Sequence, residues 1–138
     1  MRVWVLLFSI ILLSDRSFAQ DYEREKRWAA EVVPNLVVGD AVQLKMPSGR
    51  EFLGIYVQSK AAKNAILLVH GLGVHPDHGV IGILRASLAD LGYATLAIQM
   101  PVQKPAATAD DYRAVFPEAA ARIDAGARWL LKSMNQLG

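Results

Sequence analysis

The chain has 138 residues, enough for one domain, and its composition is 53% hydrophobic and 20% charged. This balance excludes a disordered chain, a collagen-like chain and a coiled coil. The formal net charge is only +2 and the basic residues are dispersed, so the sequence shows no footprint for nucleic-acid binding. There is no cysteine, which excludes disulfides, thiolate metal sites and a cysteine nucleophile.

Residues 1–19 are predicted to be a signal peptide. Residues 3–13 form an apolar stretch that is shorter than the roughly 20 residues needed to cross a bilayer, and it follows a positively charged start. Small residues near the end of this segment fit a signal peptidase site, with cleavage between Ala19 and Gln20. We therefore expect an exported, periplasmic protein whose mature domain is residues 20–138. The alternative is that the segment is kept as a membrane anchor.

The first part of the mature chain predicts a helix followed by a β-hairpin. Early acidic residues and apolar residues at helical spacing indicate a helix over residues 21–33, which Pro34 ends. Apolar and polar residues then alternate over 41–46, as in a half-buried strand. A turn signal at 47–50 separates this strand from a returning strand over 52–58.

The second part predicts strands and helices in alternation. The apolar stretch 65–69 is typical of a strand that is covered on both faces. A helix over 79–91 and a second buried strand over 93–98 follow, and Pro117 then opens the last helix. The predicted fold class is therefore α/β, with an N-terminal β-hairpin followed by βαβα and a parallel pair of central strands.

Several side chains have roles predicted from their local sequence context. Arg122 lies four residues after Glu118, so we expect the two to pair on the exposed face of the last helix. Trp28 lies on an apolar helix stripe and is predicted to be a core residue. Asp77, together with His78, is predicted to cap the helix that follows it.

The most informative segment is the apolar strand that leads into His70-Gly71-Leu72-Gly73. A buried strand followed by His-Gly-x-Gly resembles the third strand and the oxyanion loop of α/β-hydrolases. In those enzymes the loop lends a backbone N–H to the developing oxyanion, and glycines let the backbone approach the substrate. The resemblance implies that the Leu72 N–H, with the Gly73 N–H next, is the donor. It also implies that His70 holds the loop in shape and is not the catalytic base.

Two longer stretches, 28–46 and 74–101, resemble an uncharacterised family of exported bacterial α/β-hydrolase-like proteins. The sequence motifs that carry this resemblance are His75-Pro76-Asp77 just after the loop and Gln99-Met100-Pro101 after the next strand. The resemblance implies a mostly parallel α/β-hydrolase-type sheet and a loose reaction class, the hydrolysis of esters or other small acyl substrates. We expect no cofactor and no metal.

The chain departs from this resemblance at the nucleophile. An α/β-hydrolase carries its nucleophile on the next strand, within Gly-x-Ser-x-Gly. None of the serines at 48, 59, 87 and 133 has a glycine two residues away on both sides. We therefore expect a partial domain, truncated before the nucleophile strand, with no catalytic residue and no activity alone. The resemblance implies a strand order of hairpin, then 93–98, then 65–69. This order leaves Ala65–Val69 as an open edge, through which we expect self-association.

Other functions of the His70 segment are alternatives to the oxyanion loop. A small non-catalytic periplasmic module would hold a ligand or a partner protein at the His70 loop. A metal site would use His70, His75 and His78 with Asp77, but their spacing fits no strong metal motif, and a structural role in the loop is favoured. A phosphate loop is disfavoured because the Gly-x-Gly has neither a third glycine nor a Lys-Ser/Thr pair.

Overall fold

The computed structural model describes residues 20–60 and 62–136, so the predicted signal peptide lies outside the described residues. The elements are, in chain order, α1 (Tyr22–Val32), the 3₁₀ helix η1 (Val33–Asn35), β1 (Asp40–Lys45), β2 (Glu51–Val57), β3 (Ala65–Val69), α2 (Val80–Asp90), β4 (Ala94–Ile98), the 3₁₀ helix η2 (Asp110–Val115) and α3 (Phe116–Asn135). Each strand and α-helix predicted from the sequence is present; β3 has the predicted bounds, and the predicted ends of the other strands and of α1 and α2 differ by at most one residue.

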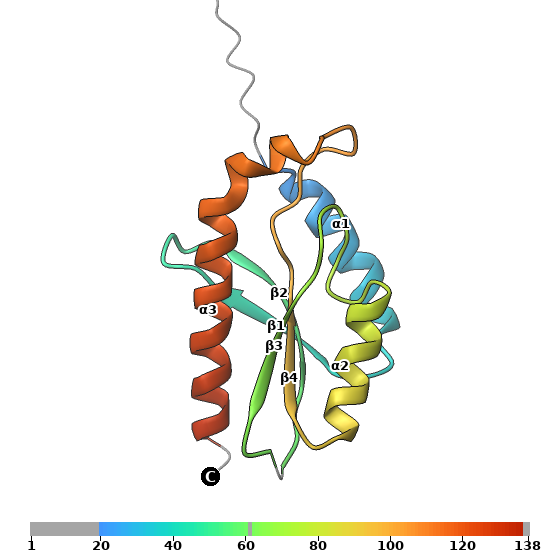
Figure 1. Ribbon diagram of the computed structural model, residues 1–138, viewed down its shortest axis with the longest axis vertical. Helices are drawn as coiled ribbons and strands as arrows, with labels where there is room; N and C mark the ends of the chain where they lie inside the picture. The colour runs from blue at the N-terminus through green and yellow to red at the C-terminus, as the bar shows by residue number, and fades with distance from the viewer. Residues whose placement is uncertain (1–19, 61, 137–138) are drawn as a thin grey trace, which may run out of the picture.

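The described strands form one sheet in the order β1-β2-β4-β3 (Figure 1). β1 and β2 form an antiparallel hairpin, β2 also pairs antiparallel with β4, and β3 and β4 run parallel. The predicted α/β class, hairpin and parallel central pair are confirmed. The sheet is mixed and not mostly parallel, because the hairpin supplies two of the described strands and its second strand joins β4 in the antiparallel sense.

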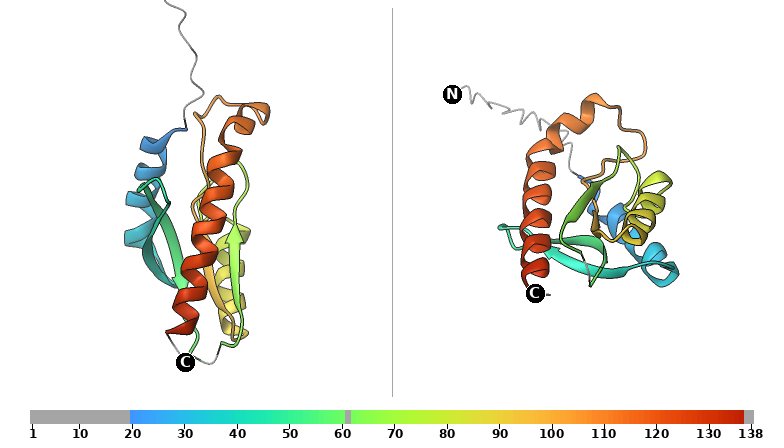
Figure 2. Two further views of the ribbon diagram at one scale, coloured as in Figure 1. Left: turned by 90° about the vertical axis from the view of Figure 1, so that its left-hand side faces the viewer. Right: turned by 60° about the horizontal axis from the view of Figure 1, so that its bottom comes forward.

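Helices cover both faces of the sheet (Figure 2). α3 lies on one face, and α1 and α2 lie on the other. Successive side chains of β2 point to opposite faces, as strand geometry requires. Phe52 and Tyr56 join the core beneath α3, whereas Leu53 and Ile55 pack with Val32 of α1.

α3 lies close to the central strands at Gly126. A Cβ atom built on Gly126 would lie 3.2 Å from Cγ2 of Ile98 and 3.3 Å from Cδ1 of Leu67. These distances are shorter than ordinary van der Waals contact, so the residue without a side chain sets how closely helix and sheet approach.

β3 is a free edge of the described sheet, and apolar side chains remain exposed around it. Val69 at its end is 39% exposed, and Ile83 of α2 and Leu131 of α3 are largely exposed. A hollow of about 520 Å³ runs between β3 and α3, lined by Leu67 and Leu130 among others. The strand carries no charge, proline or glycine, which are the usual means of blunting a sheet edge.

Trp28 does not lie in the core, so that prediction is wrong. Its ring is half-buried between the guanidinium of Arg24, 4.5 Å from the ring centroid, and the ring of His75, 5.7 Å away. On the apolar face of α1 that includes Trp28, Val32, one turn later, is the residue that packs against the sheet. The neighbour of Trp28 is the loop after β3.

No helix among residues 20–60 and 62–136 has both the length and the apolar character needed to cross a membrane.

Candidate functional site in the loop after strand β3

His70 joins the loop after β3 to the segment after β4. It directly follows β3 and is only 6% exposed. The backbone N–H of Met100 donates to its Nε2 at 2.9 Å, and its Nδ1 lies 2.8 Å from the carbonyl oxygen of Gly71. Because Nε2 accepts, the ring proton is assigned to Nδ1, which donates to Gly71. The ring therefore fixes the start of the loop at both of its nitrogens.

The electrostatic surroundings keep the His70 ring neutral. Burial lowers its pKa to about 4, and the hydrogen bond to Gly71 opposes this only in part. The positive charges that His75, His78 and Arg122 carry when protonated lower the pKa further. At neutral pH the ring is uncharged and both nitrogens are bonded within the protein. This arrangement suits a residue that shapes the loop and not one that exchanges protons with a substrate.

Gln99 is a second brace for the same loop. It follows β4, and its side chain is 1% exposed. Its Nε2 donates to the Met100 carbonyl at 2.8 Å, lies 3.1 Å from Nε2 of His70, and reaches the Val74 carbonyl at 3.5 Å. The sequence marked Gln99 only as part of a family pattern. The structure gives it contacts on both sides of the loop.

Leu72 and Gly73 form the exposed turn of the loop. Leu72 is 57% exposed, and Gly73 has a φ of 71°, in the left-handed region that favours glycine. No hydrogen bond joins the backbone N–H of either residue to another residue among the described ones. Two neighbouring backbone donors are therefore available to an oxygen atom of a ligand.

Leu72 and Gly73 border an open hollow of about 300 Å³. Arg24, Lys104 and Tyr112 also line it, and none of its lining residues carries a carboxylate. Arg24 is held in place because its Nη1 donates to the Gln103 carbonyl at 2.8 Å. The hollow is thus bordered by positive charge and by the two residues whose backbone N–H groups are unbonded, a combination that favours negatively charged oxygen.

Asp77 does not cap α2, so that prediction is wrong. The N-cap residue is Gly79, and no side chain in the described part of the chain caps the free N–H groups of the helix. The Asp77 carboxylate instead pairs with Arg85 of α2, which also donates to the Val38 carbonyl. Arg85 is buried, and a buried guanidinium requires a counter-charge, which accounts for the different use of Asp77.

The histidines of the segment do not converge on one point. His70 faces Met100, whereas the rings of His75 and His78 pack edge to face with centroids 5.5 Å apart. Asp77 is engaged by Arg85. Among residues 20–60 and 62–136, no three side chains of metal-ligating type come together.

Arg122 lies in a buried network of charges that contacts Gln99, one of the residues that hold the loop. Its Nη1 lies 2.9 Å from Oε2 of Glu25 in α1 and 2.9 Å from the Gln99 carbonyl. Its Nη2 lies 2.7 Å from Oε1 of Glu118, and its guanidinium lies 5.0 Å from the centroid of the Phe52 ring. The predicted pairing with Glu118 is present, but the predicted exposure is wrong, because Arg122 is fully buried. The buried carboxylate of Glu25 is the reason a cation lies here.

The comparisons place the chain in a family. Residues 15–129 match the family described as protein of unknown function (DUF3530). The chain belongs to the DUF3530 family. No curated protein and no solved structure matches it. The DUF3530 match covers the loop, both bracing residues and the buried network, so all the parts of the site lie within the family's shared region.

Sequence reasoning selected His70, Leu72 and Gly73 but missed the residues beneath them. The sequence did contain a signal for Gln99, because this residue begins the Gln99-Met100-Pro101 motif. Glu25 and Arg122 had none, because they are 97 positions apart and each resembles an ordinary surface charge of a helix.

Proposed function

We propose that this chain supplies the oxyanion-binding part of an exported α/β-hydrolase-like protein that acts on esters or related acyl substrates. The observation that carries the proposal is the pair of unbonded N–H groups at Leu72 and Gly73, on a loop held by His70. In acyl transfer, negative charge develops on the carbonyl oxygen of the substrate. Donors that are fixed in advance stabilise this charge without having to reorganise during the reaction.

The sheet supports the same proposal. The order β1-β2-β4-β3, with an antiparallel hairpin and a parallel β3–β4 pair, is the order expected from the resemblance to α/β-hydrolases. In that arrangement the strand with the nucleophile pairs with β3 on its free side. The loop after β3 would then lie beside the nucleophile, where a donor to the oxyanion is needed.

The described serines do not supply that nucleophile. Ser48 lies in the hairpin turn, Ser59 follows β2, and Ser87 and Ser133 lie within α2 and α3. None of them borders the hollow at Leu72 and Gly73. We therefore propose that the chain binds acyl compounds at the loop and shows no burst of product with p-nitrophenyl esters. A burst that is abolished by replacing one serine would contradict this.

Binding of a tetrahedral anion tests the proposal. Methyl propylphosphonate resembles the tetrahedral intermediate formed from methyl butyrate, and the two share the same alkyl groups. We expect calorimetry to show the phosphonate bound at least about tenfold more tightly than the ester, because transition-state analogues exploit oxyanion donors. Butyrate, a planar anion, controls for simple charge attraction and should bind more weakly than the phosphonate.

Two variants at one position make the test specific. Leu72→Pro removes the N–H donor, whereas Leu72→Ala keeps it and removes only the exposed side chain. The preference for the phosphonate should disappear in Leu72→Pro and persist in Leu72→Ala. Equal binding of phosphonate and ester, or a preference that survives in a folded Leu72→Pro protein, would overturn the proposal.

Export is part of the same proposal and rests on residues 1–19, which have the sequence pattern of a signal peptide. Protein recovered from the periplasm of an expressing bacterium should begin at Gln20. Recovery with Met1 still in place would contradict cleavage.

A further inference from the structure

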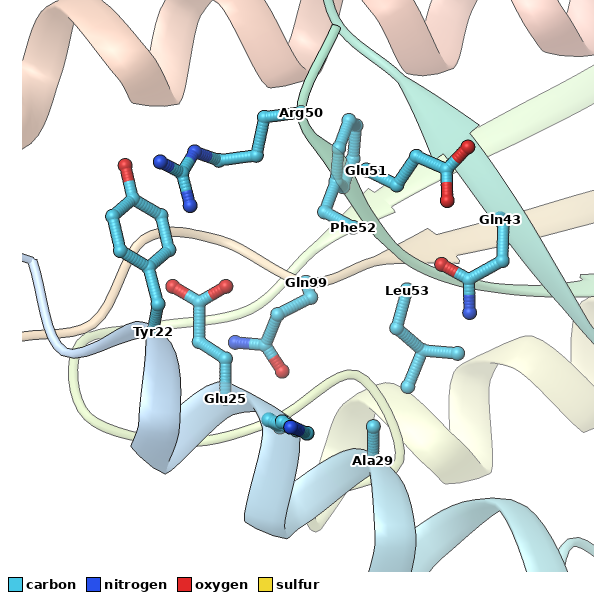
Figure 3. Close-up of a pocket in the computed structure, with 10 residues that line it drawn as sticks. Tyr22, Glu25, Ala29, Gln43, Arg50, Glu51, Phe52, Leu53 and Gln99 are labelled. Atoms are coloured by element: carbon cyan, nitrogen blue, oxygen red, sulfur yellow. The ribbon is translucent and has the colours of Figure 1, made fainter.

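A separate pocket of about 270 Å³ lies between α1 and the β-hairpin (Figure 3). Tyr22 and Ala29 of α1 form one wall, Leu53 of β2 lies opposite them, and Gln99 lies between the helix and the strand. The volume corresponds to about nine molecules of liquid water, taking about 30 Å³ for each. A compound as large as a monosaccharide would fit this volume.

The side-chain oxygen of Gln99 has no partner in this pocket. Gln99 is 1% exposed, and its Oε1 accepts no hydrogen bond from the residues that the structure describes. Its Nε2 donates to the Met100 carbonyl at 2.8 Å, which fixes the amide in this orientation, because the reversed amide would bring two acceptors together. Figure 3 shows the amide pointing from the end of β4 toward α1, with its oxygen on the helix side. A buried acceptor of this kind calls for a donor from a ligand.

The charged groups around the pocket balance one another. Lys26 and Arg50 are positive, and Glu25 and Glu51 are negative. Glu25 is already paired with a buried arginine, and the Arg50 guanidinium lies 3.6 Å from the centroid of the Tyr22 ring. This lining has no net charge, unlike the purely cationic lining of the hollow at Leu72 and Gly73. A neutral ligand that forms several hydrogen bonds suits it better than an ion.

We propose that this pocket binds a small neutral polyhydroxy compound of monosaccharide size, with one hydroxyl group donating to Oε1 of Gln99. Hydroxyl groups both donate and accept, so the others can meet the Gln43 amide and the charged groups of the rim. Ala29 and Leu53 offer apolar contact to the C–H faces of such a ligand. This inference is independent of acyl binding at the loop.

A ligand in the pocket would affect the loop after β3 through the side chain of Gln99. The same amide that accepts from the ligand lies 3.1 Å from Nε2 of His70. A hydrogen bond to its oxygen polarises the amide and strengthens the bonds that its N–H groups donate. The His70 ring signals should therefore shift when the pocket is filled, although the ligand does not touch the ring.

NMR titration with D-glucose, D-galactose and D-mannose tests the proposal. We expect at least one hexose to shift the side-chain amide signals of Gln99 in a saturable way, together with the His70 ring signals. Sodium D-gluconate, an anion of similar size, should bind more weakly. If none of the three hexoses causes a saturable shift at Gln99, or if only gluconate does, the proposal is overturned.

Matched variants on α1 locate the binding. Ala29→Leu fills the pocket, whereas Ala30→Leu adds the same side chain at an exposed position outside it. We expect Ala29→Leu to weaken hexose binding by at least about tenfold and Ala30→Leu to leave it unchanged. Gln43→Leu, a change at an exposed position of β1, should also weaken binding and keeps the test decisive if Ala29→Leu does not fold. Unchanged binding in both pocket variants would contradict the proposal.

Discussion

His70 makes the stability of the fold depend on pH. Its pKa is about 4 in the folded protein, against an ordinary value of 6.5. The unfolded chain therefore binds the proton more readily, so this contribution is complete above pH 6.5 and is lost as the pH falls toward 4. The difference corresponds to at most about 3 kcal/mol in the free energy of unfolding.

Urea unfolding at several pH values between these limits, for the native protein and two variants, measures this effect. Burial raises the pKa of Glu25, which acts in the opposite direction, so the variants are compared and not the pH values alone. His70→Gln should lose much of the dependence. His78→Gln, at an exposed position, should keep most of it, because burial and not the His78 charge is the largest cause of the lowered His70 pKa. The same dependence in His70→Gln and the native protein would contradict the role assigned to the buried ring.

Arg122 is the residue whose loss should cost most stability. Its removal leaves the buried carboxylate of Glu25 without its cation, which typically costs about 3–5 kcal/mol. We therefore expect Arg122→Met to lower the free energy of unfolding by roughly this amount in urea titrations. Arg128→Ala removes an exposed pair with Asp124 on the same helix and should cost less than about 1 kcal/mol.

A double variant separates the charge from the packing. Arg122→Met combined with Glu25→Gln removes the buried ion pair, and it should be more stable than Arg122→Met alone, because the buried position of Glu25 no longer holds a carboxylate without its cation. The partly exposed carboxylate of Glu118 loses Arg122 in both variants, so it cancels in the comparison. A double variant that is less stable than the single one would show that packing around Phe52, and not the charge, sets the cost.

For single residues, the sequence predicted the role of the His-Gly-x-Gly motif, but it did not predict which distant side chains contact one another. His-Gly-x-Gly indicated that His70 holds the loop, and its bonds to Gly71 and Met100 fit that reading. The inward position of Arg122 could not be read from its spacing to Glu118, because that spacing is equally common on exposed helix faces. Its direction depends on Glu25, which only the folded chain brings close.

At the scale of elements, α3 depends on Gly126 for its close approach to the sheet. A side chain here would meet Ile98 and Leu67, so Gly126→Val should move the helix outward and lower the free energy of unfolding by about 1–3 kcal/mol. Ala120→Val, on the exposed face of the same helix, should cost less than about 1 kcal/mol through helix propensity alone. Equal losses in urea unfolding would contradict this account of the packing.

The positions of strands and helices were predicted best where the sequence has an unbroken apolar stretch. The residues 65–69 form β3 as predicted, since an uninterrupted apolar stretch has few alternatives to a buried strand. The two 3₁₀ helices were missed, because the 3₁₀ turns at η1 and η2 continue directly into or from an α-helix and leave no separate hydrophobic period. The mixed sheet arises from the way the hairpin joins β4, which no local pattern encodes.

At the scale of the whole molecule, the free edge of β3 should promote self-association. Val69 is exposed at the end of this edge, and a lysine there would act as the charged residue that natural edges carry. We expect light scattering after size exclusion to show association that Val69→Lys reduces. Val37→Lys, at a position that is 95% exposed in a loop, adds the same charge elsewhere and should have little effect. A monomer at micromolar concentration in the native protein would contradict this.

The proposed function requires the backbone N–H groups of Leu72 and Gly73 to bind a developing oxyanion. Amide-resolved NMR during a titration with methyl propylphosphonate reports on each of these donors separately. We expect saturable downfield shifts of the Leu72 and Gly73 amide protons, with the exposed amide of Val37 unmoved. Unmoved signals at Leu72 and Gly73, or an equal shift at Val37, would contradict it.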